Sequence, residues 1–319
     1  MRLALGALLA ATLAGAVQAQ APDDPMRLLR RIQVATAKLS YSGTFIYQQG
    51  DRLEPSRITR HAGPGEGVEK IEVLGELERE IVRTRDTIRC YLPESQTIKV
   101  DKRVDQRDFP AMLPERLADL TPHYAVSRGE PARIAGYECA SVVLTPRDEF
   151  RYGYKLWADT ATGMLLKART FNARGETVEE FTFKQLAIGK VPREWLKSRH
   201  EARGWRVEKS SVTPVSLAGS GWSFGAELPG FRKIFELTRR IGDSRPVNQV
   251  VYSDGLAAVS VFIEPLSGRA EAVRAGPATL GPVNIYTREI ANHVVTVVGE
   301  APAAGVQRIA NTVEFRRPQ

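Results

Sequence analysis

Tyr41-Ser-Gly-Thr-Phe-Ile-Tyr47 is the stretch that indicates the fold, because its large apolar side chains recur at even spacing. Tyr41, Phe45 and Tyr47 fall on one face, with Gly43 between them, which is typical of a β-strand. Short connectors rich in Gly, Pro, Asp and Asn separate further strand patterns, which predicts an antiparallel meander. These patterns lie at about 55–61, 68–74, 79–85, 87–92, 96–101, 124–130, 138–145, 150–158, 164–172 and 177–186.

Two helical segments accompany the meander. Residues 24–40 predict a short amphipathic helix, with Pro25 in its first turn and Asp23 or Asp24 as its cap. A second helical segment, flanked by prolines at 109–121, interrupts the strands. The first domain should therefore span residues 20–188 and combine helices with a large sheet.

The N-terminus predicts export. Arg2 is followed by an apolar run from Leu3 to Val17, and Val17-Gln18-Ala19 suits a cleavage site, so residues 1–19 are expected to be a signal peptide. The whole chain has a formal net charge of +8. In an exported protein, a basic surface suits phosphate-bearing lipid headgroups or an acidic partner segment. Export and the lack of a dense Lys/Arg run with interleaved aromatics argue against nucleic acid.

A second domain is expected at 218–319, after a linker at 189–217 in which the periodicity fails. Residues 231–241 fit a strand or a helix. A hairpin follows, formed by 247–252, a turn at 253–255, and 256–263. Strands at about 282–287 and 291–298 and a helix at 302–313 complete a small α+β domain.

Catalytic and metal-binding patterns are weak. The four histidines are scattered singly, so we predict neither a metal site nor a cofactor. Gly221-Trp-Ser-Phe-Gly225 matches the G-x-S-x-G pattern of serine hydrolases, but the hydrophobic strand before it and the helix after it are missing. We therefore predict a protein that is not an enzyme. An oxidising compartment would allow Cys90 and Cys139 to pair, and two buried free thiols are the alternative.

At this point the chain resembles the RseB/MucB family, over about residues 26–315. Short stretches in the same order and spacing carry the resemblance. They are Tyr41–Tyr47, Gly136-Tyr-Glu-Cys139, Tyr154-Lys-Leu-Trp157-Ala-Asp159, Leu165-Leu-Lys with Gly175-Glu-Thr-Val-Glu-Glu-Phe181, and Tyr252-Ser-Asp-Gly-Leu256.

The resemblance implies a fold. The first domain would be LolA/LolB-like, which means a curved antiparallel half-barrel with helices on its concave side. The second domain would be small and α+β, with a strand at 231–240.

The resemblance also implies a function. Such proteins bind the periplasmic segment of a transmembrane anti-sigma factor of the RseA/MucA type and shield it from site-1 proteolysis. Binding of lipopolysaccharide or another acyl lipid favours release, which activates the envelope-stress sigma factor. The chain would act in the periplasm, as a monomer or a homo-oligomer. A LolA-like lipid or lipoprotein carrier is the main alternative, and a serine hydrolase is a weaker one.

Two sets of residues are candidates for these contacts, and ordinary packing is the alternative for each. The lipid set consists of aromatic strand residues of the first domain: Phe45, Tyr47, Trp157, Phe171, Phe181 and Phe183. The anti-sigma-factor set lies in the second domain: Arg239, Arg240, Tyr252, Asp254 and Phe262.

Overall fold

The structure is a computed structural model that describes residues 24–63, 67–75, 77–103, 113–114, 116–225, 228–241, 246–266 and 275–317. The predicted signal peptide and the start of the expected helical segment at 109–121 lie outside these residues. Within that segment, a short 3-10 helix, η1, spans Leu117–Leu120.

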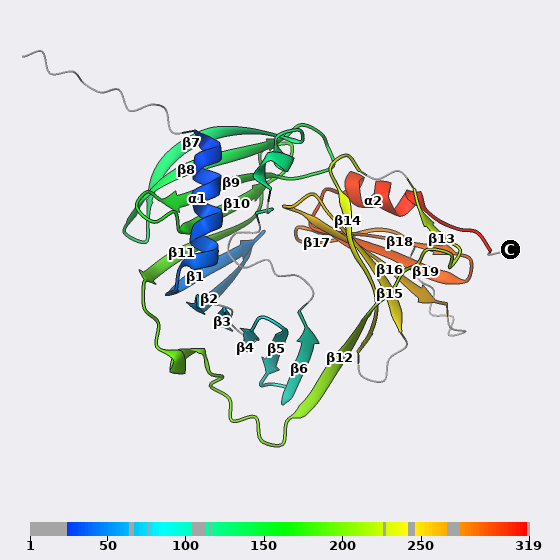
Figure 1. Ribbon diagram of the computed structural model, residues 1–319, viewed down its shortest axis with the longest axis horizontal. Helices are drawn as coiled ribbons and strands as arrows, with labels where there is room; N and C mark the ends of the chain where they lie inside the picture. Colours follow the sequence, from blue (N-terminus) through cyan, green and yellow to red (C-terminus); the bar gives the residue numbers. More distant parts are fainter. Residues whose placement is uncertain are drawn as a thin grey trace, which may run out of the picture.

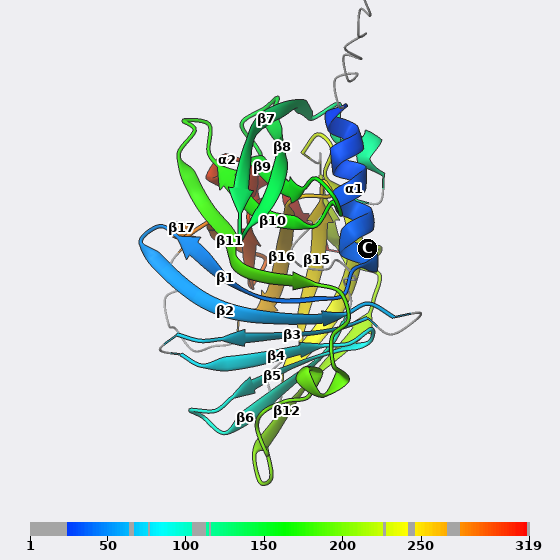
Figure 2. The ribbon, with the colours of Figure 1, turned by 90° about the vertical axis from the view of Figure 1, so that its left-hand side faces the viewer.

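The first domain is an open antiparallel sheet that bends around one long helix (Figures 1 and 2). Its strands lie side by side in the order β6-β5-β4-β3-β2-β1-β11-β10-β9-β8-β7. Their bounds are β1 Tyr41–Gln49, β2 Arg52–His61, β3 Val68–Val73, β4 Arg79–Arg83, β5 Thr87–Leu92, β6 Thr97–Lys102, β7 Tyr124–Ile134, β8 Tyr137–Pro146, β9 Gly153–Asp159, β10 Leu165–Phe171 and β11 Thr177–Ile188. The half-open curved sheet that the resemblance implied is therefore confirmed.

Helix α1, Pro25–Lys38, packs against one face of this sheet, which we call the inner face. The Asp24 side chain caps the helix by accepting a hydrogen bond from the Met26 N–H at 3.0 Å, as one of the two predicted caps would. Leu29 and Ile32 are fully buried and share one core with Ile58 and other inner-face residues of the strands. The apolar side of a period-two sheet thus meets the apolar stripe of an amphipathic helix.

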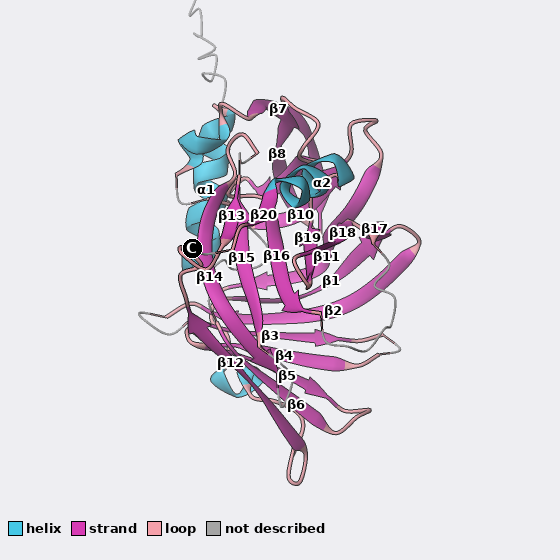
Figure 3. Cartoon of the chain, turned by 90° about the vertical axis from the view of Figure 1, so that its right-hand side faces the viewer, coloured by secondary structure: helices cyan, strands magenta, loops and turns pink. Residues whose placement is uncertain are grey.

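The second domain is a smaller antiparallel sheet covered by helix α2 (Figure 3). The structure places residues 232–241 in a strand, which resolves the ambiguity that the periodicity left. The sheet order is β14-β15-β16-β19-β18-β17, and β13 pairs separately with β20. The bounds are β13 Trp222–Phe224, β14 Arg232–Ile241, β15 Val247–Ser253, β16 Ala258–Pro265, β17 Gly276–Leu280, β18 Val283–Ile290, β19 His293–Gly299, α2 Ala303–Thr312 and β20 Val313–Phe315.

One strand belongs to both sheets. Strand β12, Arg206–Pro214, pairs in parallel with β6 through residues 206–209 and then antiparallel with β14 through residues 210–214. In Figure 1 it runs from the lower edge of the first sheet into the second. The segment predicted as a linker therefore contains a strand that continues the hydrogen-bonded ladder between the two sheets.

The rest of that segment packs on the outer face of the first sheet, with the 3-10 helix η2, Arg193–Leu196, against β2 and β3. Arg199 binds the Glu72 carboxylate at 2.8 Å, and its backbone N–H donates to Glu80 at 3.1 Å. Glu80 is only 1% exposed, because this connector covers it. These ionic contacts fix the path of the chain toward β12.

Both cysteines are free in the structure, as in the alternative to pairing, although only Cys139 is buried. Cys90 lies half-buried on β5, and Cys139 is buried on β8. Burial raises the pKa of both thiols, that of Cys139 to about 11.

No helix in the described part of the chain is both long enough and apolar enough to span a membrane.

We expect thiol titration of the unfolded protein, without reductant, to give two thiols per chain. In the folded protein, both should react slowly at pH 8. For Cys139, a pKa of about 11 leaves roughly one thousandth of the thiol as the reactive thiolate. Its reaction rate should rise about tenfold per pH unit until the pKa is approached. Thiols that appear only after reduction would show that the two cysteines are paired.

Candidate functional site

The predicted lipid-contact residues divide between the two faces of the first sheet. Phe45, Phe181 and Phe183 lie on the inner face, where their ring centroids are 5.9 to 6.4 Å apart and their planes are steeply inclined. Each of the three is at most 6% exposed. Their edge-to-face packing makes them part of the domain core.

The remaining three residues of the set have other surroundings. On the same face, the Tyr47 hydroxyl donates a hydrogen bond to Glu179. Trp157 lies on the opposite face, since it pairs with Lys167 while Phe181 pairs with Ala168. It is buried beneath the cationic groups of Lys155, Lys167 and Arg169, which lie 4.8, 5.1 and 5.8 Å from its ring centroid. Phe171 is half-buried on that same outer face and would collide with any side chain at Gly153. The six residues therefore do not form a single surface.

The predicted partner-binding residues of the second domain are also dispersed. Tyr252 and Asp254 are buried at 4% and 6% exposure. Arg239 is half-buried, and its Nη1 lies 3.9 Å from Asp101 Oδ1 at the end of β6. Arg240 is exposed, and Phe262 is half-buried on β16. Of this set, Arg239, Arg240 and Phe262 keep surface that a partner can reach.

Asp254 joins the two domains. Its Oδ1 accepts hydrogen bonds from the N–H groups of Leu256 and Ala257, at 2.9 and 2.8 Å, which closes the β15–β16 turn. Its Oδ2 lies 3.0 Å from the Arg151 guanidinium and accepts a 3.0 Å hydrogen bond from the Tyr124 hydroxyl of β7. The side chains of Arg151 and Asp254 are both fully buried, so Asp254 relies on Arg151 for charge compensation. Arg151 has a second, partly exposed partner, because its Nε lies 3.0 Å from Asp148 Oδ1.

Apolar rings enclose this pair. The Arg151 guanidinium lies over Tyr124 and Phe231, with centroid distances of 5.6 and 5.3 Å. Burial raises the pKa of Tyr124, so its hydroxyl stays protonated and donates to Asp254. We call Tyr124, Arg151, Phe231 and Asp254 the domain junction. The sequence prediction missed Tyr124, Arg151 and Phe231, because nothing local links them to Asp254.

Close backbone contact surrounds the junction. Gly230 adopts a φ of +81°, and a Cβ there would lie 2.3 Å from the His123 ring. Burial and the nearby Arg151 charge lower the pKa of His123, which favours its neutral form. Asn284 adds a further link, since its Nδ2 donates to the Tyr152 hydroxyl at 3.0 Å. The junction is therefore a tightly packed interdomain contact.

The G-x-S-x-G stretch does not form a nucleophile elbow. Ser223 lies in the short strand β13, which pairs with β20, and the described residues after it form a turn. His293 packs edge-on against Trp222, at a centroid distance of 5.2 Å. Because successive residues of a strand face opposite ways, Ser223 points away from that histidine. Within the described ranges, no group of three His, Cys, Asp or Glu side chains is placed to hold a metal ion.

These features define a class: a two-domain protein with an open, helix-filled antiparallel sheet joined to a second small sheet by a shared strand and a buried ion pair. The model of the MucB/RseB N-terminal domain matches residues 24–211, and that of the C-terminal domain matches residues 216–314. The chain belongs to the MucB/RseB family.

Known relatives match over nearly their whole length. The sigma factor AlgU regulatory protein MucB of Pseudomonas aeruginosa is 30% identical over 98% of this chain and 95% of its own. The sigma-E factor regulatory protein RseB of Escherichia coli K12 is 26% identical over 100% of this chain and 98% of its own. A crystal structure of MucB in complex with MucA(peri) has a TM-score of 0.71 and 27% identity, and covers 92% of this chain and 100% of that one.

The junction leads to a stability prediction. We expect Asp254→Asn to lower the free energy of unfolding by up to about 3–5 kcal/mol, because it removes the fully buried counter-charge of Arg151 and leaves only the partly exposed Asp148. The amide keeps an Oδ1 acceptor for the turn, while its NH2 group replaces the Oδ2 that accepts from both Arg151 and Tyr124. Urea denaturation would measure the loss.

Two companion variants make the experiment decisive. Arg151→Met removes the buried cation, so Asp254→Asn should cost much less in that background. The matched control is Glu138→Gln, which breaks an exposed pair with Arg133 and should cost no more than about 1 kcal/mol. Equal costs of Asp254→Asn in both backgrounds would contradict a coupled pair.

Proposed function

We propose that this chain is a periplasmic regulator that binds the periplasmic segment of a transmembrane anti-sigma factor of the RseA/MucA type. The observation that carries the proposal is the likeness, over 92% of this chain, to MucB in complex with MucA(peri). The regulatory roles in the names of the two curated relatives support it. The export signal expected at residues 1–19 agrees with a periplasmic location.

We further propose that binding shields the segment from site-1 proteolysis and that lipopolysaccharide or another acyl lipid favours release. A lipid can drive release only to the extent that it binds the free regulator more tightly than the complex. The two-sheet architecture suits such coupling, since the junction and β12 connect the domains at two separate places. A ligand that alters one domain can thereby change a surface on the other.

The candidate residues for contacting the anti-sigma factor and the lipid differ in how accessible they are. Arg239, Arg240 and Phe262 remain our candidates for the anti-sigma factor, because they retain accessible surface. Tyr252 and Asp254 would act indirectly, through the arrangement of the domains. Phe45, Phe181 and Phe183 are buried in one core with Leu29 and Ile32 of α1, so they would meet an acyl chain only after this core had opened.

A protease-protection assay tests the function. The mature chain, residues 20–319, is mixed with the periplasmic segment of the candidate anti-sigma factor and a site-1 protease of the DegS kind. At ten times the dissociation constant, only about one tenth of the segment is free, so cleavage should slow about tenfold. Added lipopolysaccharide should restore the cleavage rate.

The control for that assay is polysaccharide without acyl chains, which should leave the protection intact. Transfer of acyl lipid between vesicles without any protection would overturn the regulator proposal and favour the carrier.

A further inference from the structure

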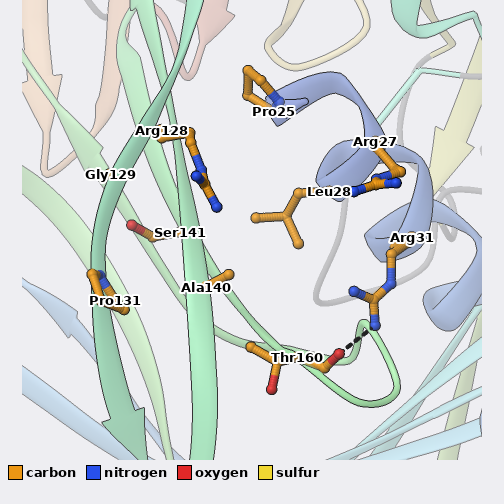
Figure 4. A pocket seen from close by; sticks show the side chains of 10 residues that line it. All are labelled: Pro25, Arg27, Leu28, Arg31, Arg128, Gly129, Pro131, Ala140, Ser141 and Thr160. Atoms are coloured by element: carbon orange, nitrogen blue, oxygen red, sulfur yellow. Dashed lines mark hydrogen bonds between the residues drawn. The ribbon is translucent and has the colours of Figure 1, made fainter. Parts of the chain in front are cut away.

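A cavity of about 420 Å³ lies between the N-terminal half of α1 and strands β7 and β8 (Figure 4). Arg27, Leu28 and Arg31 line it from the helix, and Arg128 lines it from β7. In Figure 4 the Leu28 side chain points into the space between the helix and the strands, and Arg128 extends toward it from the strand side. The helix and two strands that are distant from it in the sequence thus meet around one hollow, with Pro25, Gly129, Pro131, Ala140, Ser141 and Thr160 completing its lining.

The cavity is cationic. Three guanidinium groups line it, and no carboxylate is among the lining residues that the structure describes. Arg31 is held in place, because its Nη2 donates to the carbonyl oxygens of Thr160 and Ala161 at 2.7 and 3.1 Å. Neutral carbonyls orient this guanidinium without cancelling its charge. Like charges gathered around one hollow create a positive potential that attracts an anion.

The same cavity also has apolar walls. Leu28, Ala140 and two prolines provide apolar surface, which a phosphate or sulfate ion alone would not contact favourably. Beyond Arg31 a second hollow of about 340 Å³ is lined by Arg30 and Val34, and Val34 is 51% exposed. Arg27 and Arg31 line both hollows. Guanidinium groups beside exposed apolar surface match an amphiphile, which has an anionic headgroup and an apolar part.

We propose that the cavity between α1 and strands β7 and β8 binds the phosphate headgroup of an anionic amphiphile, and that the exposed side of α1 contacts the adjoining apolar part. This inference rests on the proposed function and deepens it by naming where a releasing lipid is recognised. Guanidinium groups suit a phosphomonoester, because each can form two parallel hydrogen bonds to its oxygens. The volume accommodates a headgroup and excludes a complete lipid.

The consequence for the regulator concerns α1. This helix covers the inner face of the first sheet, where it shares a core with Phe45, Phe181 and Phe183. A headgroup held between α1 and β7 therefore acts on a helix that belongs to the same core as those aromatic residues. Headgroup recognition and the packing of this core become linked through a single helix.

Vesicle binding by the mature chain tests the site. The probes are phosphatidylcholine vesicles with and without phosphatidic acid, which supplies a phosphomonoester. We expect binding only when phosphatidic acid is present, and an affinity loss of about tenfold or more for Arg27→Gln/Arg128→Gln. Arg133→Gln, on the same strand but outside the cavity, should change the affinity less than about twofold.

A second variant keeps the charge and fills the space. Ala140→Met should weaken binding to the same vesicles, because its longer side chain occupies the floor of the cavity. Thermal melting establishes that each variant is folded. Equal losses for the double variant and Arg133→Gln would overturn the site in favour of general surface charge. Inorganic phosphate that competes fully at low millimolar concentration would overturn the amphiphile and leave a phosphate site.

The protection assay separates this inference from the function on which it rests. The double variant should still protect the anti-sigma segment but should no longer release it when lipopolysaccharide is added. If the unaltered chain fails to protect, the proposed function is wrong, while the vesicle experiment still reports on the cavity. If the double variant releases normally, the cavity is not the recognition site.

Discussion

The two carboxylate oxygens of Asp254 bind groups in different domains, and the arrangement of the two domains depends on these contacts. One oxygen closes the β15–β16 turn within the second domain, and the other binds Arg151 and Tyr124 of the first. A buried guanidinium is costly without a counter-charge, so the domains must meet with the turn placed against Arg151. The positive φ of Gly230 and its contact with His123 tighten the same interface. The Asp254 side chain thus helps to set the orientation of the second sheet.

A second connection lies at β12. The junction fixes the domains by side-chain contacts, whereas β12 fixes them by backbone hydrogen bonds to β6 and to β14. Two separate attachments restrict rotation of one domain against the other far more than a single flexible linker would. A regulator built in this way can transmit the occupancy of one domain to the other. The cationic cavity beside α1 lies in the first domain, and the candidate partner residues Arg239 and Arg240 lie in the second, on a strand that pairs directly with β12.

Much of the fold could be predicted from the sequence, because strands with one buried face alternate in hydrophobicity. The stretch Tyr41–Tyr47 shows this, because residues 41, 43 and 45 of β1 are buried while 42 and 44 are half-buried. Strand β12 could not be predicted in this way, because most of its side chains are exposed and it has no apolar period. Strand β17 could not be predicted either, because its side chains are mostly exposed.

The sites were harder to predict than the strands. Arg151 and Asp254 are 103 residues apart, and Tyr124 and Asp254 are 130 apart, so no local pattern relates them. The sequence left open whether Phe45, Phe181 and Phe183 form a core or a surface, and their burial makes them core. Arg27 and Arg31 are neighbours in the sequence, but Arg128 joins them only in the folded chain.

The shared strand also has a mechanical consequence. A force that pulls the second domain along β12 would load the β6–β12 hydrogen bonds in shear. Such bonds must then break together, whereas bonds that are peeled from one end break one after another. The parallel pairing at residues 206–209 would therefore resist sliding of the domains more strongly than their separation from one end. A tether pulling on this protein would produce different responses depending on the direction in which it pulled.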